Sequence, residues 1–289
     1  MRYHPSSKEV KRANAELVKA ETGGMQVPDT AQKKPSSLTV GRGTIEPLRT
    51  VVVMPAYNAA KTLETTLAKI PPGVVDTIIL VDDGSRDGTA ALAVSLDLVV
   101  ISHPHNAGYG ANQKTCYIEA LRDGADVIVM LHPDGQYDPA ILDDMVEVIR
   151  SGRADVVLGS RFLNRGGARA GGMPWWKRIA NRFLTGYENR VLGLGLTEYH
   201  TGYRAYSRAF LTTVPFLRNS NDFVFDTQIL TQAASFKFKV AEVPVTTKYF
   251  EDASSVNFRV SLIYGLKTVW TVNRYVLHRL GLRSRRYSR

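Results

Sequence analysis

Two adjacent carboxylates are the first feature of this sequence that could do chemistry. Asp82 and Asp83 open the segment DDGSRDGT at residues 82–89. Neighbouring carboxylates repel each other unless a hydrogen-bond donor, or a ligand such as a base or a ribose, compensates one of them. A turn in which Asp87 caps the following helix would explain the rest of the segment. It would leave the acidic pair unexplained, so this motif alone is compatible with ligand binding and with a plain turn.

A second acidic segment, HPDGQYDP at residues 132–139, presents His132, Asp134 and Gln136 at alternate positions. Oxygen ligands at this spacing suit Mg²⁺ or Mn²⁺ bridged to a diphosphate, because Mg²⁺ usually takes only one or two protein carboxylates. His132 would join a Mn²⁺ site more readily than a Mg²⁺ site. The alternative is a turn whose Asp138 caps the next helix. Capping leaves Asp134 and Gln136 unexplained.

A basic run at residues 161–190 contains seven basic side chains and one acidic side chain, and it includes Arg161 and Arg178. A solvated helix face is the common fate of such a run. Its position directly after a predicted strand favours a phosphate site, where arginine supplies paired donors. Nucleic-acid binding is a third interpretation, but the segment has no recognisable nucleic-acid-binding motif. The glycines of HNAGYGAN at residues 105–112 lack the spacing of a dinucleotide fingerprint and indicate a turn that packs a helix closely on the sheet.

A parallel sheet would position these segments. Apolar stretches alternate with helical patterns from residue 50 onward. Strands are predicted at 50–54, 76–81, 96–101, 126–131 and 154–159, with helices near 60–70, 87–95, 109–122 and 139–150. Apolar strands separated by helices indicate an α/β fold built from βαβ units, with helices on both faces of the sheet. Ligands bind outside the carboxyl ends of such strands, so the loops after them should hold the chemistry.

The composition of the 289 residues, 44% hydrophobic and 22% charged, is that of a globular protein and excludes disordered, collagen-like and disulfide-scaffold classes. The single cysteine, Cys116, cannot form an internal disulfide. The net charge of +10 is concentrated at the ends of the chain, and residues 253–289 hold eight basic and no acidic side chains. We expect a partly disordered extension and linker at 1–48, a main domain at 49–252, and a basic amphipathic helix and tail at 253–289.

The C-terminal region is predicted to form a helix over residues 256–280, with an apolar stripe that includes Trp270 and with basic flanks. Such a helix can lie in the membrane interface. A helix packed on the domain or on a second subunit fits the same pattern, so a homo-oligomer is also possible. The chain start lacks the apolar core of a secretory signal, and the apolar stretch 260–272 is too short to span a membrane. We expect a cytoplasmic protein, peripherally associated with the membrane, with no nucleic-acid partner.

Taken together, the motifs resemble a family 2 nucleotide-sugar glycosyltransferase of the GT-A fold. The resemblance rests on PAYNA after the first strand, the DDGSRDGT loop, N-x-G-Y-G-A-N, the acidic segment after the fourth strand, and GSRF. Within that family the chain is most similar to the dolichol-phosphate mannosyltransferase and polyprenyl-phosphate glycosyltransferase group, which also shows T-G-Y-R (201–204) and E-V-P-V (242–245). The match covers roughly residues 50–260, and the motifs are specific jointly although each is weak alone.

The resemblance implies roles for individual residues. Asp134 and Gln136 would hold the Mg²⁺ or Mn²⁺, and Arg161 and Arg178 would approach the acceptor phosphate. The group commonly has D-x-D-x-Q where this chain has His132-Pro133-Asp134-Gly135-Gln136, so one carboxylate of the expected ligand set is missing. The residues implied to bind the nucleotide sugar are Pro55, Ala56, Tyr57, Asn58, Asp82, Asp83, Gly108 and Lys248.

The predicted function is transfer of a sugar, with inversion, from a UDP- or GDP-sugar to a polyprenyl or dolichyl phosphate. A lipid monophosphate is largely dianionic at neutral pH and needs no base. A hydroxyl acceptor would need one, and Asp222 or Asp226 would supply it. Two other classes are a non-catalytic nucleotide-sugar binder, suggested by His132, and a nicotinamide enzyme, disfavoured because no glycine follows the first strand.

Overall fold

The computed structural model describes residues 48–164, 166–247, 258–282 and 284–288. The chain divides into two units, residues 1–45 and 46–289, and all described residues belong to the second. The predicted N-terminal extension, apart from its last residue, lies outside the described residues. So do the predicted boundary between residues 252 and 253 and the implied ligand Lys248.

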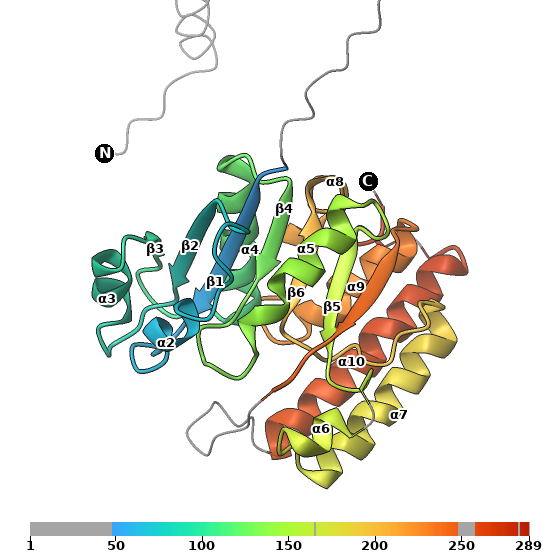
Figure 1. Cartoon of the computed structure of the whole chain (residues 1–289). Helices are drawn as coiled ribbons and strands as arrows, with labels where there is room; N and C mark the ends of the chain where they lie inside the picture. Colours follow the sequence, from blue (N-terminus) through green and yellow to red (C-terminus); the bar gives the residue numbers. More distant parts are fainter. Residues whose placement is uncertain (1–47, 165, 248–257, 283, 289) are drawn as a thin grey trace, which may run out of the picture. The chain divides into compact units, whose positions relative to one another are not determined.

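A seven-stranded sheet in the order β3-β2-β1-β4-β6-β5-β7 forms the centre of the second unit (Figure 1). All strand pairs are parallel except those of β6, which runs antiparallel to β4 and β5. The prediction of a mainly parallel, GT-A type sheet is confirmed. The strands are β1 (Thr50–Ala56), β2 (Thr77–Asp82), β3 (Val99–Ser102), β4 (Val127–Met130), β5 (Val156–Ser160), β6 (Arg204–Ser207) and β7 (Val240–Pro244).

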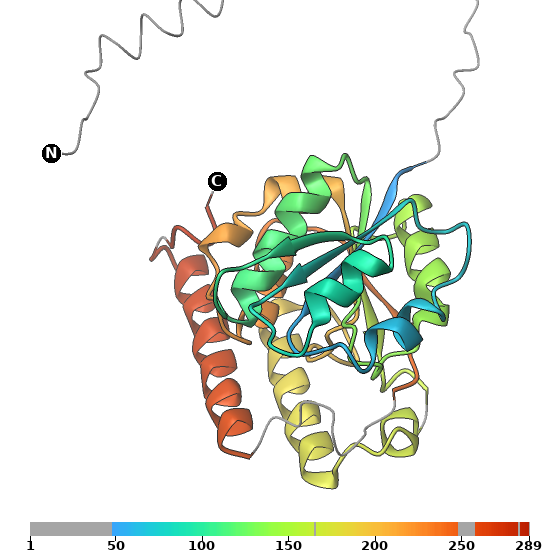
Figure 2. The same ribbon diagram turned by 90° about the vertical axis from the view of Figure 1, so that its left-hand side faces the viewer.

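Helices cover both faces of the sheet, as Figure 2 shows. Successive side chains of a strand point to opposite faces, so Val51 and Val53 join one buried cluster while Val52 and Met54 join the other. The first cluster includes side chains of α4 (Tyr109–Arg122), α8 (Arg208–Thr213) and α9 (Phe225–Ser235). The second includes side chains of α2 (Leu63–Leu67), α3 (Thr89–Ser95) and α5 (Leu142–Arg150).

Two long helices, α7 (Trp175–Leu192) and α10 (Phe258–Arg279), lie side by side, and α10 also packs against α9 (Figure 1). The remaining short helices are α6 (Gly167–Ala170), η1 (Pro139–Ile141) and η2 (Phe216–Arg218). The predicted C-terminal helix is therefore present as α10. Within the described ranges, no helix combines the length and apolar character needed to cross a membrane.

The basic tail after α10 folds back onto the body. Tyr287 is buried, and its hydroxyl lies 3.3 Å from Thr231 Oγ1 of α9. Arg218 of η2 donates hydrogen bonds to the main-chain carbonyls of Arg285 and Ser288. The described part of the tail, residues 284–288, is thus held against η2 and α9.

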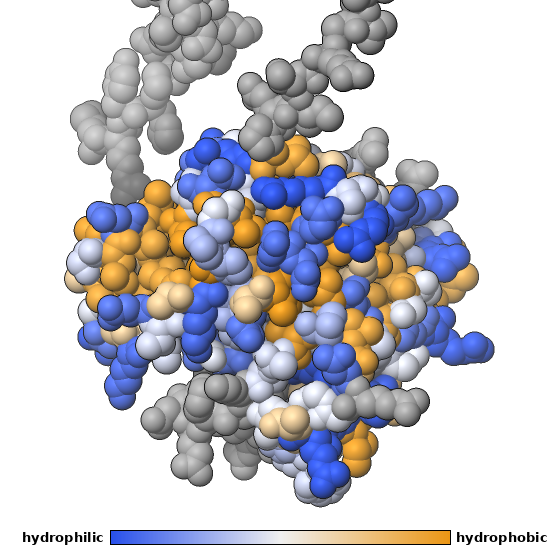
Figure 3. Space-filling model, in the orientation of Figure 1, coloured by the Kyte–Doolittle hydropathy of each residue, from blue (hydrophilic) through white to orange (hydrophobic). Residues whose placement is uncertain are grey.

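The opposite edge of the sheet also exposes apolar side chains. Val94 of α3 is 62% exposed and Val99 of β3 is 48% exposed. Figure 3 shows a hydrophobic area over this edge, interrupted by hydrophilic residues. Scattered exposure of this kind is normal for a globular protein.

Candidate active site

The loops predicted to carry the chemistry meet at one edge of the sheet. The carboxyl ends of β1, β2, β4 and β5 lie there because these strands are parallel neighbours or are joined through β6. The antiparallel direction of β6 brings its first residue to the same edge, where Arg204 pairs with Met130 of β4 and Leu158 of β5. The segment before β6 therefore enters the site, which a purely parallel sheet would not allow.

The loops after β1 and β2 are tied together by hydrogen bonds. The main-chain N–H of Asn58 donates to Ser85 Oγ (2.8 Å), and the N–H of Arg86 donates to Asn58 Oδ1 (2.9 Å). Asn58 has a left-handed φ of 53°, a conformation that asparagine tolerates better than most residues. Tyr57 is 52% exposed beside it. The proposed nucleotide-binding segment 55–58 thus has a fixed backbone and one exposed aromatic ring.

The adjacent carboxylates Asp82 and Asp83 differ in their partners, although each is only 4% exposed. Asp83 accepts hydrogen bonds from the N–H groups of Ala107 (2.9 Å) and Gly108 (3.1 Å) and contacts His103 Nδ1 at 2.7 Å. Asp82 Oδ2 accepts a hydrogen bond from the Ser85 N–H at 3.2 Å, whereas its Oδ1 is buried with no partner among the described residues. An unsatisfied buried oxygen is costly. Asp82 therefore has an acceptor available for a ligand, and Asp83 holds the loop before α4.

Helix α4 begins against the segment that precedes α9. The Gly110 N–H donates to the Asn221 carbonyl at 2.8 Å. A Cβ on Gly108 would lie 2.6 Å from the same oxygen, and a Cβ on Gly110 would clash with the Ser220 carbonyl. The glycines serve close packing, as predicted, but the close contact is with residues 220 and 221, outside the sheet. This contact brings the start of α9 to the site.

His132 lies between an aromatic ring and the main chain of the TGYR segment. Its ring stacks on Tyr109 with centroids 5.6 Å apart and planes 14° apart, and its Nε2 lies 3.4 Å from the Tyr109 hydroxyl. A Cβ on Gly202 would come within 2.9 Å of His132 Cδ2. The histidine that departs from the D-x-D pattern is therefore packed into this position.

Asp226, the candidate base for a hydroxyl acceptor, is surrounded by protein donors and is 8% exposed. Gln113 Nε2 donates to its Oδ1 at 3.2 Å, and the Tyr109 hydroxyl donates to its Oδ2 at 2.9 Å. The fully buried Arg204 lies 3.6 Å from Oδ2. Both carboxylate oxygens are thus engaged by the protein, and a catalytic role for Asp226 stays a prediction.

The loop that carries Asp134 and Gln136 is anchored on both sides. Thr62 Oγ1 donates to the Pro133 carbonyl (2.6 Å), and the Gly202 N–H donates to Tyr137 Oη (2.8 Å). Asp134 Oδ1 accepts the Gln136 N–H at 2.9 Å, while Oδ2 makes no hydrogen bond to the described residues. Asp138 accepts a hydrogen bond from the Ala140 N–H at the start of η1, which confirms the predicted cap.

The donor set of this loop fits a divalent ion that takes most of its ligands from elsewhere. In the part of the chain that the structure describes, no three or more His, Cys, Asp or Glu side chains gather closely enough to hold a metal alone. Mg²⁺ in phosphate-transfer sites commonly uses one or two carboxylates and completes its shell with phosphate oxygens and water. Asp134, half-buried with an open oxygen, meets that requirement.

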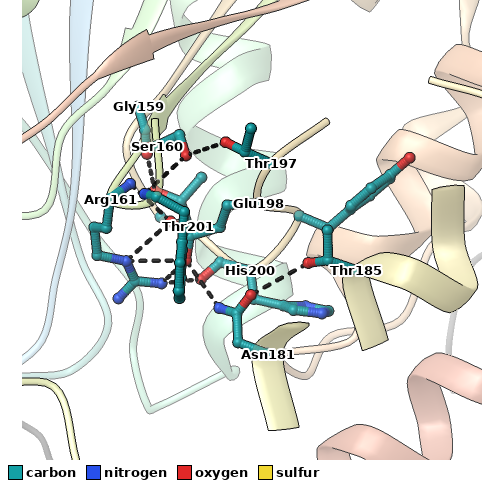
Figure 4. A network of polar contacts seen from close by, with 12 residues as sticks. Gly159, Ser160, Arg161, Asn181, Thr185, Thr197, Glu198, His200 and Thr201 are labelled. Carbon is teal, nitrogen blue, oxygen red and sulfur yellow. Dashed lines mark hydrogen bonds and ion pairs between the residues drawn. The ribbon is translucent and has the colours of Figure 1, made fainter. Parts of the chain in front are cut away.

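Arg161, at the end of β5, forms a buried ion pair with Glu198 (Figure 4). The main-chain N–H and the side-chain Nε of Arg161 donate to the Glu198 carboxylate, each at 2.9 Å. Its Nη2 also donates to the His200 carbonyl at 2.6 Å. Asn181 Nδ2 of α7 donates to the same carboxylate at 2.9 Å. Since Glu198 is fully buried, this network fixes the guanidinium of Arg161 and ties α7 to the strand end.

The first turn of α7 adds two further cations, Lys177 and Arg178, of which Lys177 lies close enough to Arg161 for their charges to interact. Burial lowers the pKa of Lys177, and the positive charge of Arg161 lowers it further. Arg178 is half-buried, and its Nε has no hydrogen-bond partner among the described residues. Glu198 compensates the charge of Arg161, but among the described residues no acidic side chain forms an ion pair with Lys177 or Arg178, and cations gathered without an anion are unfavourable. The predicted pair Arg161 and Arg178 therefore comes from two elements, and Lys177 is an addition that sequence reasoning counted only within the basic run.

Sequence reasoning gave no role to the two acidic residues that position Arg161 and the segment before β6, although Glu242 lies in the E-V-P-V motif. Glu198 binds Arg161, and Glu242 of β7 accepts the N–H groups of Thr197 (2.7 Å) and Glu198 (2.9 Å). Burial raises the pKa of Glu242, although the hydrogen bonds from Thr197 oppose that shift. A signal was available for Glu242, because an acidic residue within the apolar strand AEVPV is unusual. Glu198, in a loop, had none.

Comparison with known proteins places these features in a family context. The family model described as Glycosyl transferase family 2 matches residues 51–214. A polyprenol monophosphomannose synthase of Mycolicibacterium smegmatis is 32% identical over 212 residues, which cover 70% of this chain and 79% of that protein. A UDP-N-acetylglucosamine–dolichyl-phosphate N-acetylglucosaminyltransferase of Methanococcus voltae is 27% identical over 217 residues, covering 69% and 86%.

Solved structures share the fold at lower identity. Glucosyl-3-phosphoglycerate synthase from Mycobacterium tuberculosis, in complex with Mn²⁺, UDP and glucosyl-3-phosphoglycerate, matches with a TM-score of 0.59. The match covers 79% of this chain and 80% of that chain at 19% identity. At this identity the likeness concerns the fold alone. It is a GT-A-like fold, in a protein crystallised with a nucleoside diphosphate and a divalent ion.

Proposed function

This chain belongs to glycosyl transferase family 2, and from that premise we propose that it transfers a sugar from a nucleoside-diphosphate sugar to a polyprenyl or dolichyl phosphate. The acceptor class is supported by the names of both curated relatives, which refer to polyprenol and dolichyl phosphate. Such an acceptor is held in a membrane by its lipid chain. The proposal therefore includes peripheral association of the enzyme with a membrane.

The observation that carries the phosphate acceptor is the group of three cations at the end of β5. Arg178 has a buried Nε without a partner among the described residues, and Lys177 has a lowered pKa beside Arg161. Glu198 pairs with Arg161, and a phosphate would supply acceptor oxygens and negative charge to Lys177 and Arg178. A neutral hydroxyl acceptor would leave Lys177 and Arg178 without a compensating anion among the described residues, since Glu198 pairs with Arg161.

The donor binds along the ends of β1 and β2 in this proposal. Asp82 Oδ1 accepts a hydrogen bond from the ribose or the base, which satisfies a buried oxygen that otherwise has no partner among the described residues. Tyr57 offers an exposed ring beside it. Asp134 would hold a Mg²⁺ or Mn²⁺ ion, with Gln136 and His132 as the further candidate ligands. When bound, the ion neutralises charge that develops on the leaving diphosphate.

No protein base is needed for this reaction. The second pKa of the acceptor phosphate is about 6, so the phosphate is mostly dianionic at neutral pH. One phosphate oxygen forms a bond to the anomeric carbon, and the bond from that carbon to the diphosphate oxygen breaks. The nucleoside diphosphate leaves with the electron pair, and a single displacement inverts the configuration. Asp226, whose oxygens both accept protein hydrogen bonds, is not required.

A donor and acceptor panel tests the proposal. The full chain is incubated with UDP- and GDP-sugars, Mg²⁺ or Mn²⁺, and polyprenyl phosphate, and the lipid product is detected by mass spectrometry. We expect a glycosyl phosphate lipid from one donor. Asp134→Ala should abolish transfer and keep the melting temperature, whereas Asp143→Ala, an exposed carboxylate on α5, should keep both. Near-normal transfer by Asp134→Ala would overturn the metal assignment.

A non-catalytic nucleotide-sugar binder is the second candidate. His132, packed between Tyr109 and Gly202, occupies the place of the first acidic residue of the usual metal motif. Calorimetry with the same donors separates the two candidates. Donor binding with no turnover of any donor or acceptor in the panel would favour the binder.

A further inference from the structure

We propose that α7 and α10 together form one surface that docks on an anionic membrane, with α7 contributing as much of it as the C-terminal helix. This two-helix face comprises Trp175, Ile179 and Phe183 of α7 and Leu262, Leu266 and Trp270 of α10. The use of the surface rests on the proposed lipid-phosphate acceptor. Its existence rests on exposure, helix geometry and charge.

Large apolar side chains of the two-helix face are exposed. Trp175 is 67% exposed, Phe183 is 73% exposed and Trp270 is 65% exposed. On each helix the three members are spaced four residues apart, and residues at that spacing lie on one side of a helix. Each helix therefore exposes a continuous apolar stripe. A grouped stripe of this kind marks a site of interaction with a protein or a membrane.

The two stripes face the same way. α7 and α10 meet where Leu184 approaches Gly265 and where the Tyr187 hydroxyl donates to Asn273 Oδ1 at 2.9 Å. The second contact lies closer to the C-terminus than the first on both helices, so the helices run parallel. Each residue step turns a helix by about 100°. Leu184 and Gly265 point toward each other across the contact. Because the helices are parallel, Phe183, one residue before Leu184, and Leu266, one residue after Gly265, are rotated toward the same side of the helix pair.

The opposite sides of the same helices are buried, which makes the two-helix face the outer one. On α7 the buried residues include Asn181, Thr185 and Glu188, and on α10 they include Thr268 and Val272. Figure 2 shows the two helices as one layer next to the body of the protein. A membrane could reach this layer from outside without any rearrangement of the body.

The charge of the two helices selects anionic lipids. The single acidic residue in the described sequence of either helix, Glu188, is fully buried. Arg182 and Arg190 of α7 and Arg274 of α10 are exposed. Basic residues beside an apolar face with tryptophans suit the headgroup region of an anionic membrane. A second copy of this face would place like charges opposite each other, so a symmetric dimer fits less well.

Docking through this face would also present the acceptor site to the lipid. Lys177 and Arg178 lie on the same turns of α7 as Trp175 and Ile179, but on other sides of the helix. Arg161 lies close to Lys177. A lipid phosphate at the membrane surface would then meet these cations at the start of α7. The same helix that inserts its apolar side would hold the phosphate on its inner side.

Vesicle co-sedimentation of the full chain tests the surface. The probes are vesicles of phosphatidylcholine alone and of phosphatidylcholine mixed with phosphatidylglycerol. We expect binding to the mixed vesicles, weakened about tenfold or more by Phe183→Glu or by Leu266→Glu, because each removes an inserted apolar group and adds repulsion. Val94, an apolar residue on α3 with an exposed fraction close to that of Leu266, provides the matched control, and Val94→Glu should bind as the wild type does.

A water-soluble, short-chain isoprenyl phosphate separates this inference from the proposed function. We expect Phe183→Glu to keep sugar transfer to this acceptor while losing vesicle binding. If the wild type transfers sugar but Phe183→Glu binds mixed vesicles equally well, the docking surface is wrong and the function stands. The surface is also wrong if Phe183→Glu converts a wild-type dimer to a monomer, since the face would then join two copies. Vesicle binding without transfer to any isoprenyl phosphate would support the surface and overturn the function.

Discussion

The hydroxyl of Tyr109 donates a hydrogen bond to Asp226 Oδ2 at 2.9 Å and lies 3.4 Å from His132 Nε2. Tyr109 begins α4, Asp226 lies in the first turn of α9, and His132 follows β4. Burial raises the pKa of Tyr109 well above its usual value, and the charge of Asp226 raises it further. The raised pKa favours the protonated phenol, whose hydroxyl joins three elements of the site.

Tyr109→Phe should destabilise the protein. The change leaves Asp226 Oδ2 without its hydroxyl donor in a buried position, which costs about 1–3 kcal/mol. Urea denaturation measures the loss. Tyr187→Phe removes a partly exposed hydrogen bond to Asn273 and should change the stability much less. A Tyr109→Phe variant as stable as Tyr187→Phe would show that the contact with Asp226 contributes little.

Asp82→Asn and Asp83→Asn should have opposite effects on donor binding and on the melting temperature. Asp82 has a buried oxygen without a partner among the described residues, so the amide should leave the melting temperature unchanged or higher. It should weaken donor binding about tenfold or more, since a hydrogen bond to a charged group is worth about 1.5–3 kcal/mol. Asp83 accepts two main-chain hydrogen bonds and contacts His103, so its amide should lower the melting temperature. Calorimetry and thermal unfolding of both variants provide the measurements.

The reverse pattern would contradict this division of roles. If Asp83→Asn bound the donor weakly at an unchanged melting temperature, Asp83 would be the ligand contact. Asp82 would then be a structural residue.

The central elements were predictable because burial on both faces leaves a clear trace in the sequence. α4 has the predicted bounds of 109 and 122, and β1 and β2 begin at or within one residue of their predicted starts. Helix α2 is shorter than the predicted 60–70, since the chain before it forms turns tied through Ala59 and Ala60 to Thr89 of α3 and to Asp87. The loops that follow the parallel strands were identified for the same reason.

Strand β6 and the loop before it, which contains Glu198, could not be predicted from local patterns. β6 has only four residues, and its antiparallel place between β4 and β5 is set by tertiary pairing. Glu198 stands in a loop and looks like an ordinary surface acid. Its burial depends on Arg161, 37 positions earlier in the chain. Periodicity cannot reveal a contact of that kind, and only the T-G-Y-R resemblance pointed to this segment.

Glu198→Ala should be among the most destabilising single changes in the chain. Removing one partner of a buried ion pair typically costs about 3–5 kcal/mol, because the other charge stays buried. Glu119→Ala is the matched control, since Glu119 pairs with the largely exposed Arg122, and surface pairs are worth about 0–1 kcal/mol. Denaturant unfolding of both variants tests the difference. Equal losses for the two variants would mean that the Arg161–Glu198 pair is solvated.

Cys116 should be unreactive in the folded protein and reactive after unfolding. Its side chain is fully buried on α4. Burial raises the pKa of the thiol well above its ordinary value, and the negative charge of Asp83 raises it further. Only the thiolate is an effective nucleophile, so raising the pH through the ordinary thiol pKa should speed modification of unfolded chains and leave native chains almost unmodified. A chromogenic disulfide reagent, with and without denaturant, measures both rates. Rapid modification of the native protein that follows pH as a free thiol does would show that the interior around α4 opens to solvent.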